Sequence, residues 1–166
     1  MIARASLVAT LIAAVFGRSF ALAPAIDGAK PLPVPRFVSL RSDRINLRVG
    51  PGRNYPILWV LTKKDMPVEI IREFEGWRMI EDWQGTKGWV QERMVTAKRN
   101  VVVTGAIQPL YASPNRSAAL VAHAEPGVVA RLLKCEAGWC RIEAGRIAGW
   151  VEKGEVWGVF PQEVVR

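Results

Sequence analysis

The side chains of this chain that could do chemistry are two cysteines, one histidine and one adjacent pair of acidic residues. A Cys–His hydrolase needs a free thiolate with a base within reach, and a thioredoxin-like redox site needs two cysteines separated by two residues. Cys135 and Cys140 are separated by four residues, and His123, the only histidine, stands in a stretch that we expect to be an exposed loop. Neither chemistry is predicted.

The remaining catalytic options are equally weak. A zinc site built around His123 would need several carboxylates near it, and the acidic residues are not clustered there. Glu81 and Asp82 cannot work as an acid and a base on one substrate, because neighbours in a strand point to opposite faces. The sequence therefore predicts a non-enzymatic protein without a metal site or a cofactor.

The two cysteines are better explained as structural. The segment 134–141 has the pattern of a β-hairpin with Ala137-Gly138 at its turn, which places Cys135 opposite Cys140 in a non-hydrogen-bonded pair. Cα atoms in such a pair are about 4.5 Å apart, at the short end of the range that a disulfide tolerates. We expect a disulfide that closes a small loop and stabilises it modestly.

The first 23 residues have the pattern of a secretory signal peptide. A short basic start is followed by an apolar run from Ala5 to Phe16, and Ala21-Leu22-Ala23 is typical of a cleavage site. The run is too short to span a bilayer, so we expect no membrane span after cleavage and a periplasmic location. The alternative is an uncleaved N-terminal anchor, which would leave the rest of the chain on the same side of the membrane.

The charge of the chain favours anionic surfaces outside the cytoplasm. Cleavage would lower the net charge from +8 to +6, because residues 1–23 contain Arg4 and Arg18 and no acidic residue. Summed positive charge attracts anionic head groups, lipopolysaccharide and the acidic peptides of a cell wall. The cations are scattered, and the densest groups are only pairs, so no nucleic-acid surface is predicted.

After a proline-rich linker over 24–36, the chain repeats itself. Three landmarks recur at offsets of 61 to 63 residues. They are Leu47–Pro51 with Leu110–Pro114, Gly76–Ile80 with Gly138–Ile142, and Gly88–Val90 with Gly149–Val151. We therefore predict one unit over 37–98, a second over 99–158 and a C-terminal tail over 159–166.

Each predicted unit has the signals of short strands. Residues 66–72 and 127–133 are rich in β-branched side chains, and each segment leads to a Gly-Trp turn. No helical stripe of ten residues occurs in 37–158, so the predicted class is all-β, with small barrels or a sandwich. A unit of about 60 residues needs large side chains to form a core. The candidates are Trp77, Trp89, Trp139 and Trp150, although a small barrel can bury one face of a ring only.

The first unit resembles the bacterial SH3-like domain family. Its segment 44–57 (RINLRVGPGRNYPI) resembles the family's N-L-R-x-G-P-G opening, and the Gly-Trp and Gly-Trp-Val segments follow in the family's order. The second unit keeps both tryptophan landmarks but departs from the opening at four positions. These are Pro109, Tyr111, Ser113 and Asn115. The resemblance implies two tandem SH3-like β-barrels, and it puts in doubt any function of the glycine loop in the second.

By the same resemblance, such modules bind cell-wall peptide or glycan in many exported proteins and partner proteins in others. We expect a ligand in a groove between the 46–57 loop and the hairpin at Glu75-Gly76. The candidate ligand-binding residues are Asn46, Arg48, Arg53, Tyr55, Trp59 and Trp83. The alternative is an adaptor that binds another envelope protein, supported by the degenerate second copy and the apolar segment 156–161, which could equally seal its own barrel.

Overall fold

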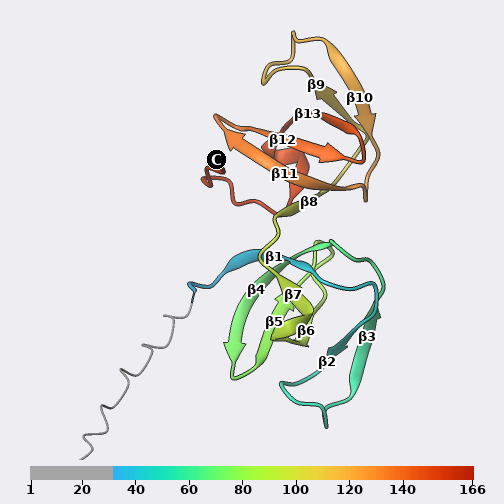
Figure 1. Ribbon diagram of the computed structural model, residues 1–166, viewed down its shortest axis with the longest axis vertical. Coiled ribbons are helices and arrows are strands. Elements are labelled where there is room, and N and C mark those ends of the chain that lie inside the picture. The colour runs from blue at the N-terminus through green and yellow to red at the C-terminus, as the bar shows by residue number, and fades with distance from the viewer. Residues whose placement is uncertain (1–31) are drawn as a thin grey trace, which may run out of the picture. The chain divides into compact units, whose positions relative to one another are not determined.

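The computed structural model describes residues 32–166 (Figure 1). The predicted signal peptide, with its alternative as an anchor, and most of the predicted linker lie outside the described residues. Within 32–166, no helix is long and apolar enough to cross a membrane.

The described chain is built from strands, which confirms the all-β prediction, and two seven-stranded antiparallel sheets follow one another along it (Figure 1). Sheet one, here called barrel 1, has the order β3-β2-β6-β5-β4-β1-β7, and sheet two, barrel 2, has the order β10-β9-β13-β12-β11-β8-β14. Each strand of barrel 2 takes the place of the strand seven positions earlier. This identical order confirms the tandem repeat.

The strands of barrel 1 are β1 (Arg36–Leu40), β2 (Ile45–Arg48), β3 (Ile57–Leu61), β4 (Pro67–Phe74), β5 (Trp77–Glu81), β6 (Lys87–Gln91) and β7 (Val95–Thr96). Those of barrel 2 are β8 (Asn100–Val103), β9 (Gln108–Tyr111), β10 (Leu120–Ala124), β11 (Val129–Glu136), β12 (Trp139–Ala144), β13 (Ile147–Glu152) and β14 (Val156–Trp157). A one-turn 3-10 helix precedes the last strand of each barrel, η1 (Glu92–Met94) and η2 (Lys153–Glu155).

The long central strand of each barrel carries a register shift at an equivalent place. In β4 the pairing with β5 slips between Ile70 and Arg72, and in β11 the pairing with β12 slips between Leu132 and Lys134. A bulge bends a strand and increases its twist, which lets one eight-residue strand serve both halves of a small barrel. The two Gly-Trp hairpins follow directly from these bent strands.

Each barrel has its own cluster of buried side chains, and both clusters are aliphatic. In barrel 1 it contains Leu40, Ile45, Leu47, Val68, Ile70, Ile80 and Val90, and in barrel 2 Val101, Val103, Leu110, Leu132, Ile142 and Val151 together with both cysteines. Of the four tryptophans predicted as core, only Trp89 is buried, at 8% exposure, and none belongs to either cluster. Branched aliphatic side chains fill most of the small interior, and Trp77, Trp139 and Trp150 are only half-buried at its margin.

The glycine of the Gly-Trp-Val landmark has a packing reason in both copies. A Cβ at Gly88 would lie 2.6 Å from Cγ of Leu47, and one at Gly149 would lie 2.8 Å from Cβ of Leu110. The strand β6 or β13 therefore passes so close to β2 or β9 that only glycine fits. This close passage brings β2 and β6 together at the edge of the candidate site.

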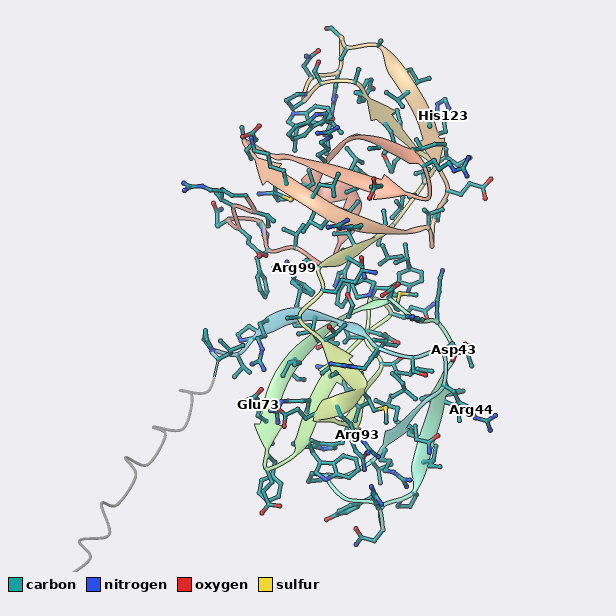
Figure 2. All side chains as sticks on the ribbon, in the orientation of Figure 1. Asp43, Arg44, Glu73, Arg93, Arg99 and His123 are labelled. Carbon is teal, nitrogen blue, oxygen red and sulfur yellow. A yellow bond between two sulfur atoms is a disulfide. The ribbon has the colours of Figure 1, made fainter. Side chains whose placement is uncertain are left out.

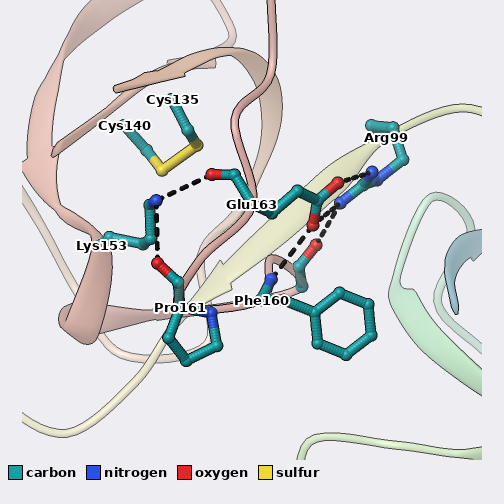
Figure 3. The surroundings of a disulfide bond; sticks show 8 residues. Arg99, Cys135, Cys140, Lys153, Phe160, Pro161 and Glu163 are labelled. Carbon is teal, nitrogen blue, oxygen red and sulfur yellow. Dashed lines mark hydrogen bonds and ion pairs between the residues drawn. A yellow bond between two sulfur atoms is a disulfide. The ribbon is translucent and has the colours of Figure 1, made fainter. Parts of the chain in front are cut away.

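The predicted C-terminal tail is packed against barrel 2. Val159 is buried in its core, and Val165 exchanges two backbone hydrogen bonds with Cys135. Glu163 accepts hydrogen bonds from the guanidinium of Arg99 and from the backbone N–H of Phe160, as Figure 3 shows. Burial alone would raise the pKa of Glu163, but these hydrogen bonds and the charges of Arg99 and Lys153 hold it below its usual value.

Residues 32–166 form a single compact unit, and a buried polar contact joins its two barrels. Asn100, at the start of β8 and 3% exposed, donates one amide hydrogen to Oγ of Ser39 (3.0 Å) and one to the carbonyl of Asp65 (2.8 Å). Beside it, the buried ring of Phe37 in β1 packs edge-on against Trp157 and also contacts Phe160. The two barrels therefore share a structured interface.

Candidate functional site

A basic groove lies on barrel 1 where the ends of several strands meet. Two adjoining hollows of about 360 and 410 Å³ share Arg53, Trp77, Gln91 and Arg93 as lining residues. The first hollow is also lined by Arg44, Asn46 and Arg48, and the second by Gly76 and Glu92. We call this surface the arginine groove, because four of its side chains are guanidinium groups.

Alternation along β2 explains how two of these side chains reach the groove. Ile45 and Leu47 are buried in the core, so Asn46 and Arg48 point outward. Arg53 comes from the loop after β2, and Trp77 and Gln91 are cross-strand partners on β5 and β6. Figure 2 shows Arg44 just before β2 and Arg93 in η1. Four separate segments of the chain, residues 44–48, 53, 76–77 and 91–94, thus supply the site.

The electrostatic feature of the groove is positive charge without an acidic partner. Among the residues that the structure describes, none of Arg44, Arg48, Arg53 and Arg93 forms an ion pair. Arg48 donates to the backbone carbonyl of Tyr55 at 2.6 Å, and Arg93 donates to Oε1 of Gln91 at 2.9 Å. Glu92, at the rim, is occupied by Arg78 at 2.8 Å. The groove is therefore suited to an anion.

The glycine loop that precedes the groove is packed by an aromatic ring. A Cβ at Gly50 would collide with the ring of Tyr55, and one at Gly52 would lie 3.1 Å from its Cδ2. The Gly50-Pro51-Gly52 turn is thus required because Tyr55 covers it, and this packing orients the loop that carries Arg53.

The structure brings together only part of the predicted ligand-binding set. Asn46, Arg48 and Arg53 line the groove at the predicted place between the 46–57 loop and Gly76, and Tyr55 lies behind the loop. Trp59 is 60% exposed on β3, away from the groove lining. Trp83 lines a different hollow beside residues 61–66.

Four groove residues were not among the predicted ligand-binding ones. They are Arg44, Trp77, Gln91 and Arg93. Trp77 was predicted to be core, and it is half-buried because one part of its ring forms a groove wall. The signal that could have found Arg44 is its place two residues before Asn46 on the outward face of β2. Gln91 and Arg93 come beside Asn46 and Arg48 through the pairing of β6 with β2, which no local pattern indicates.

Barrel 2 has a hollow of about 240 Å³ at the equivalent place, with a different lining. Arg116 makes two hydrogen bonds to Glu152 across it, at 2.5 and 2.9 Å. The hydrogen bond from Arg116 holds the pKa of Glu152 below its usual value. Tyr111 packs edge-on against Trp139, with ring centroids 5.8 Å apart. Glu155 also lines the hollow, so the two glutamates outnumber the one arginine and the net charge of the hollow is negative.

The side chains considered for catalysis either stabilise the fold or face the solvent. Cys135 and Cys140 form the predicted disulfide across the hairpin, with Cα atoms 4.1 Å apart. His123 is exposed, as predicted, but it lies on β10 rather than in a loop (Figure 2), because residues 120–124 pair with β9. Asp82 accepts hydrogen bonds from two backbone N–H groups of its turn. Within 32–166, no three His, Cys, Asp or Glu side chains gather as a metal site.

Comparison with known proteins places the chain in a family. The profile of the bacterial SH3 domain matches residues 41–96 and again 104–158. A putative N-acetylmuramoyl-L-alanine amidase of Bacillus subtilis, YrvJ, is 26% identical over 123 residues, which are 68% of this chain and 24% of that protein. The chain thus spans about a quarter of this relative.

Two solved structures of Trichomonas vaginalis proteins, NlpC2 and NlpC1, are 13% and 12% identical to the chain, with TM-scores of 0.36 and 0.35. The matches cover 80% and 82% of this chain and 51% and 50% of those chains. The two family matches begin directly after β1 and directly after β8, and they end with β7 and one residue past β14, so each covers one sheet except its first strand. The chain therefore belongs to the bacterial SH3 domain family and carries two copies of that domain in tandem.

Proposed function

We propose that this protein is an exported, non-catalytic binding module of the cell envelope, which recognises cell-wall peptide through the arginine groove of barrel 1. The observation that carries the proposal is the set of four guanidinium groups without an acidic partner beside the half-buried ring of Trp77. The family supports a binding role, and the name of the Bacillus relative supports a substrate in the wall. A periplasmic location is part of the proposal and rests on the predicted signal peptide.

The chemistry of the groove matches that of a wall peptide. The stem peptides of a bacterial wall carry free carboxylates, and a guanidinium binds a carboxylate through two parallel hydrogen bonds. The indole of Trp77 gives a flat apolar surface against which the apolar part of a small peptide residue can pack. A net charge of +6 after signal cleavage would also attract the chain to an anionic polymer before specific contacts form.

A non-catalytic role fits the residues available. Both thiols of the chain are joined in the disulfide, so no thiolate is free to attack a peptide bond. The single histidine is exposed on β10 of barrel 2, whereas the arginine groove belongs to barrel 1. The groove itself offers cations, amides and an indole, which bind and orient a ligand.

Co-sedimentation with purified sacculi tests the proposal. We expect the mature chain to pellet with sacculi, and Arg53→Gln/Arg93→Gln to bind at least about 100-fold more weakly, because two charge-assisted hydrogen bonds at about 1.5–3 kcal/mol each are lost. The matched control is Arg72→Gln/Arg146→Gln, which removes the same charge from exposed positions outside the groove. Equal loss in both double variants would mean non-specific adhesion, and absence of pelleting would refute wall binding.

A second candidate function is that of an adaptor for another envelope protein, and strand β3 supports it. Ile57, Leu58, Trp59 and Val60 are all exposed, and β3 stands at the end of the strand order of barrel 1. An exposed apolar edge strand is a template for pairing with another chain. Crosslinking in cells separates the two candidates: one stoichiometric protein partner, lost on Trp59→Arg, would favour the adaptor over wall binding.

A further inference from the structure

The two barrels can be superimposed residue by residue through their strand pairing. Arg48 of β2 faces Trp89, and Tyr111 of β9 faces Trp150 in the same way. Trp77 is paired with Gln91, and Trp139 with Glu152. The constant offset of 63 residues between Pro51 and Pro114 makes Arg116 the counterpart of Arg53.

In barrel 2 this constellation already contains a carboxylate. The guanidinium of Arg116 holds Glu152 through its Nε and Nη2 atoms, so one bidentate edge of the arginine is occupied by a residue of the same barrel. The ring of Tyr111 stands where barrel 1 has the side chain of Arg48, and it packs against Trp139. The hollow is lined by one arginine and two glutamates, and the two negative charges of the glutamates repel an anion.

In barrel 1 the same place is open. Gln91 replaces Glu152, and its side-chain oxygen accepts a hydrogen bond from Arg93 rather than from Arg53. Arg53 is exposed, and within residues 32–166 its guanidinium has no hydrogen-bonded or ionic partner. The deeper hollow is lined by four arginines and no acidic residue. The two grooves therefore share a geometry and differ in whether the carboxylate is built in.

We infer that Glu152 occupies in barrel 2 the position that a ligand carboxylate takes in barrel 1, so that of the two grooves only that of barrel 1 is open to a carboxylate, at a site formed around Arg53 and kept open by Gln91. The inference rests on the proposed function and adds to it the chemical class of the group bound, a free carboxylate at the end of a flexible chain, as in an acidic or C-terminal peptide residue.

Two isosteric substitutions in the mature chain should exchange which groove is open to a ligand carboxylate and which is closed. Gln91→Glu places a carboxylate beside Arg53 and should close barrel 1, and Glu152→Gln releases Arg116 and should open barrel 2. Glu125→Gln, an exposed acid-to-amide change outside both grooves, is the control for net charge. Titration with sodium acetate, followed by 15N chemical shifts, reports each groove separately and needs no wall ligand.

We expect acetate to shift the resonances of Arg53 and Trp77 in the parent chain, with no shift at Arg116. Glu152→Gln should add shifts at Arg116 and Trp139, and Gln91→Glu should weaken acetate binding at Arg53 at least about tenfold, because like charge repels it. The control should match the parent. Shifts at Arg116 in the parent chain, or unchanged affinity in Gln91→Glu, would overturn the inference.

The same titration with a soluble disaccharide-tetrapeptide from sacculi separates this inference from the proposed function. Acetate binding at Arg53 without binding of the wall fragment would leave the carboxylate site standing and refute wall recognition. Binding of the fragment with equal strength by the parent and by Gln91→Glu would leave wall recognition standing and refute the carboxylate site. Binding of the fragment but not of its amidated form would support both.

Discussion

Replacement of Asn100 by alanine tests the interface between the barrels. The amide of Asn100 is buried and donates two hydrogen bonds, to the hydroxyl of Ser39 and to the backbone carbonyl of Asp65. Asn100→Ala removes both and leaves the buried hydroxyl of Ser39 and the half-buried carbonyl of Asp65 without this donor. A hydrogen bond contributes about 1 kcal/mol, and a buried polar group left unsatisfied costs about 1–3 kcal/mol. We expect the free energy of unfolding to fall by about 2–4 kcal/mol.

Guanidinium-induced unfolding, followed by tryptophan fluorescence and by circular dichroism, measures the effect. A loss of this size is a large fraction of the about 5–15 kcal/mol that stabilises an ordinary domain. Because Asn100 links two barrels, the variant should also unfold less cooperatively, with a smaller dependence of the unfolding free energy on denaturant. Asn115→Ala is the matched control, because Asn115 is exposed in a loop of barrel 2 and its side-chain amide bonds to the half-buried hydroxyl of its neighbour Ser113.

The reasoning would be refuted by an Asn100→Ala variant that keeps the parent stability within about 0.5 kcal/mol, the range of ordinary surface changes. It would also be refuted by equal losses in Asn100→Ala and Asn115→Ala, since only the first residue is buried between the barrels. A large loss of unfolding free energy with unchanged cooperativity would mean that the amide stabilises barrel 2 alone. The contact with Ser39 would then not couple the unfolding of the two barrels.

Two further predictions concern charge and backbone. Burial and the opposed carboxylate of Glu81 raise the pKa of Glu69, so its ionised form opposes folding; we expect Glu69→Gln to stabilise the chain by about 0.5 kcal/mol or less at neutral pH, because solvent screens much of the repulsion. This gain should vanish as the pH falls below the usual carboxyl range, where Glu69 is neutral too, and a gain independent of pH in thermal unfolding would contradict the assignment. Gly158 has φ +122°, and an added Cβ would lie 2.6 Å from the carbonyl oxygen of Asn100. Gly158→Ala should therefore cost about 1–3 kcal/mol in the same assay, whereas Gly154→Ala, in open space, should change stability little.

Much of the fold could be predicted because its signals are local. The Gly-Trp hairpins, the β-branched runs and the Ala137-Gly138 turn each specify a strand or a turn within about ten residues, and their recurrence predicts the second barrel. The role of the tryptophans could not be predicted in the same way. Hydrophobicity indicates that an indole avoids water, but the interior of a small barrel accepts branched aliphatic side chains, and the indoles remain at its margin.

The sequence predicted only those residues of the candidate site that come from a single segment of the chain. The groove predicted beside the 46–57 loop indicated Asn46, Arg48 and Arg53, because all three belong to one stretch of chain. Gln91 and Arg93 join them through the pairing of β2 with β6, some 40 residues away, and such long-range pairing leaves no mark on the local pattern. The contrast between Gln91 and Glu152 becomes meaningful only when both barrels have been placed in register.

The second copy departs from the family's opening where the groove is and stays close to it where the barrel closes. Gly149 still allows β13 to pass β9, and the core remains aliphatic, so the fold persists. The changes fall on residues such as Tyr111, which packs on Trp139, while Arg116 is bound by Glu152. Meanwhile β8 and the C-terminal segment place Asn100 and Phe160 against barrel 1. A barrel that has filled its own groove and buries part of its surface against its neighbour is better suited to supporting barrel 1 than to binding a ligand. Gln91→Glu and Glu152→Gln would reverse which of the two grooves is open to a carboxylate.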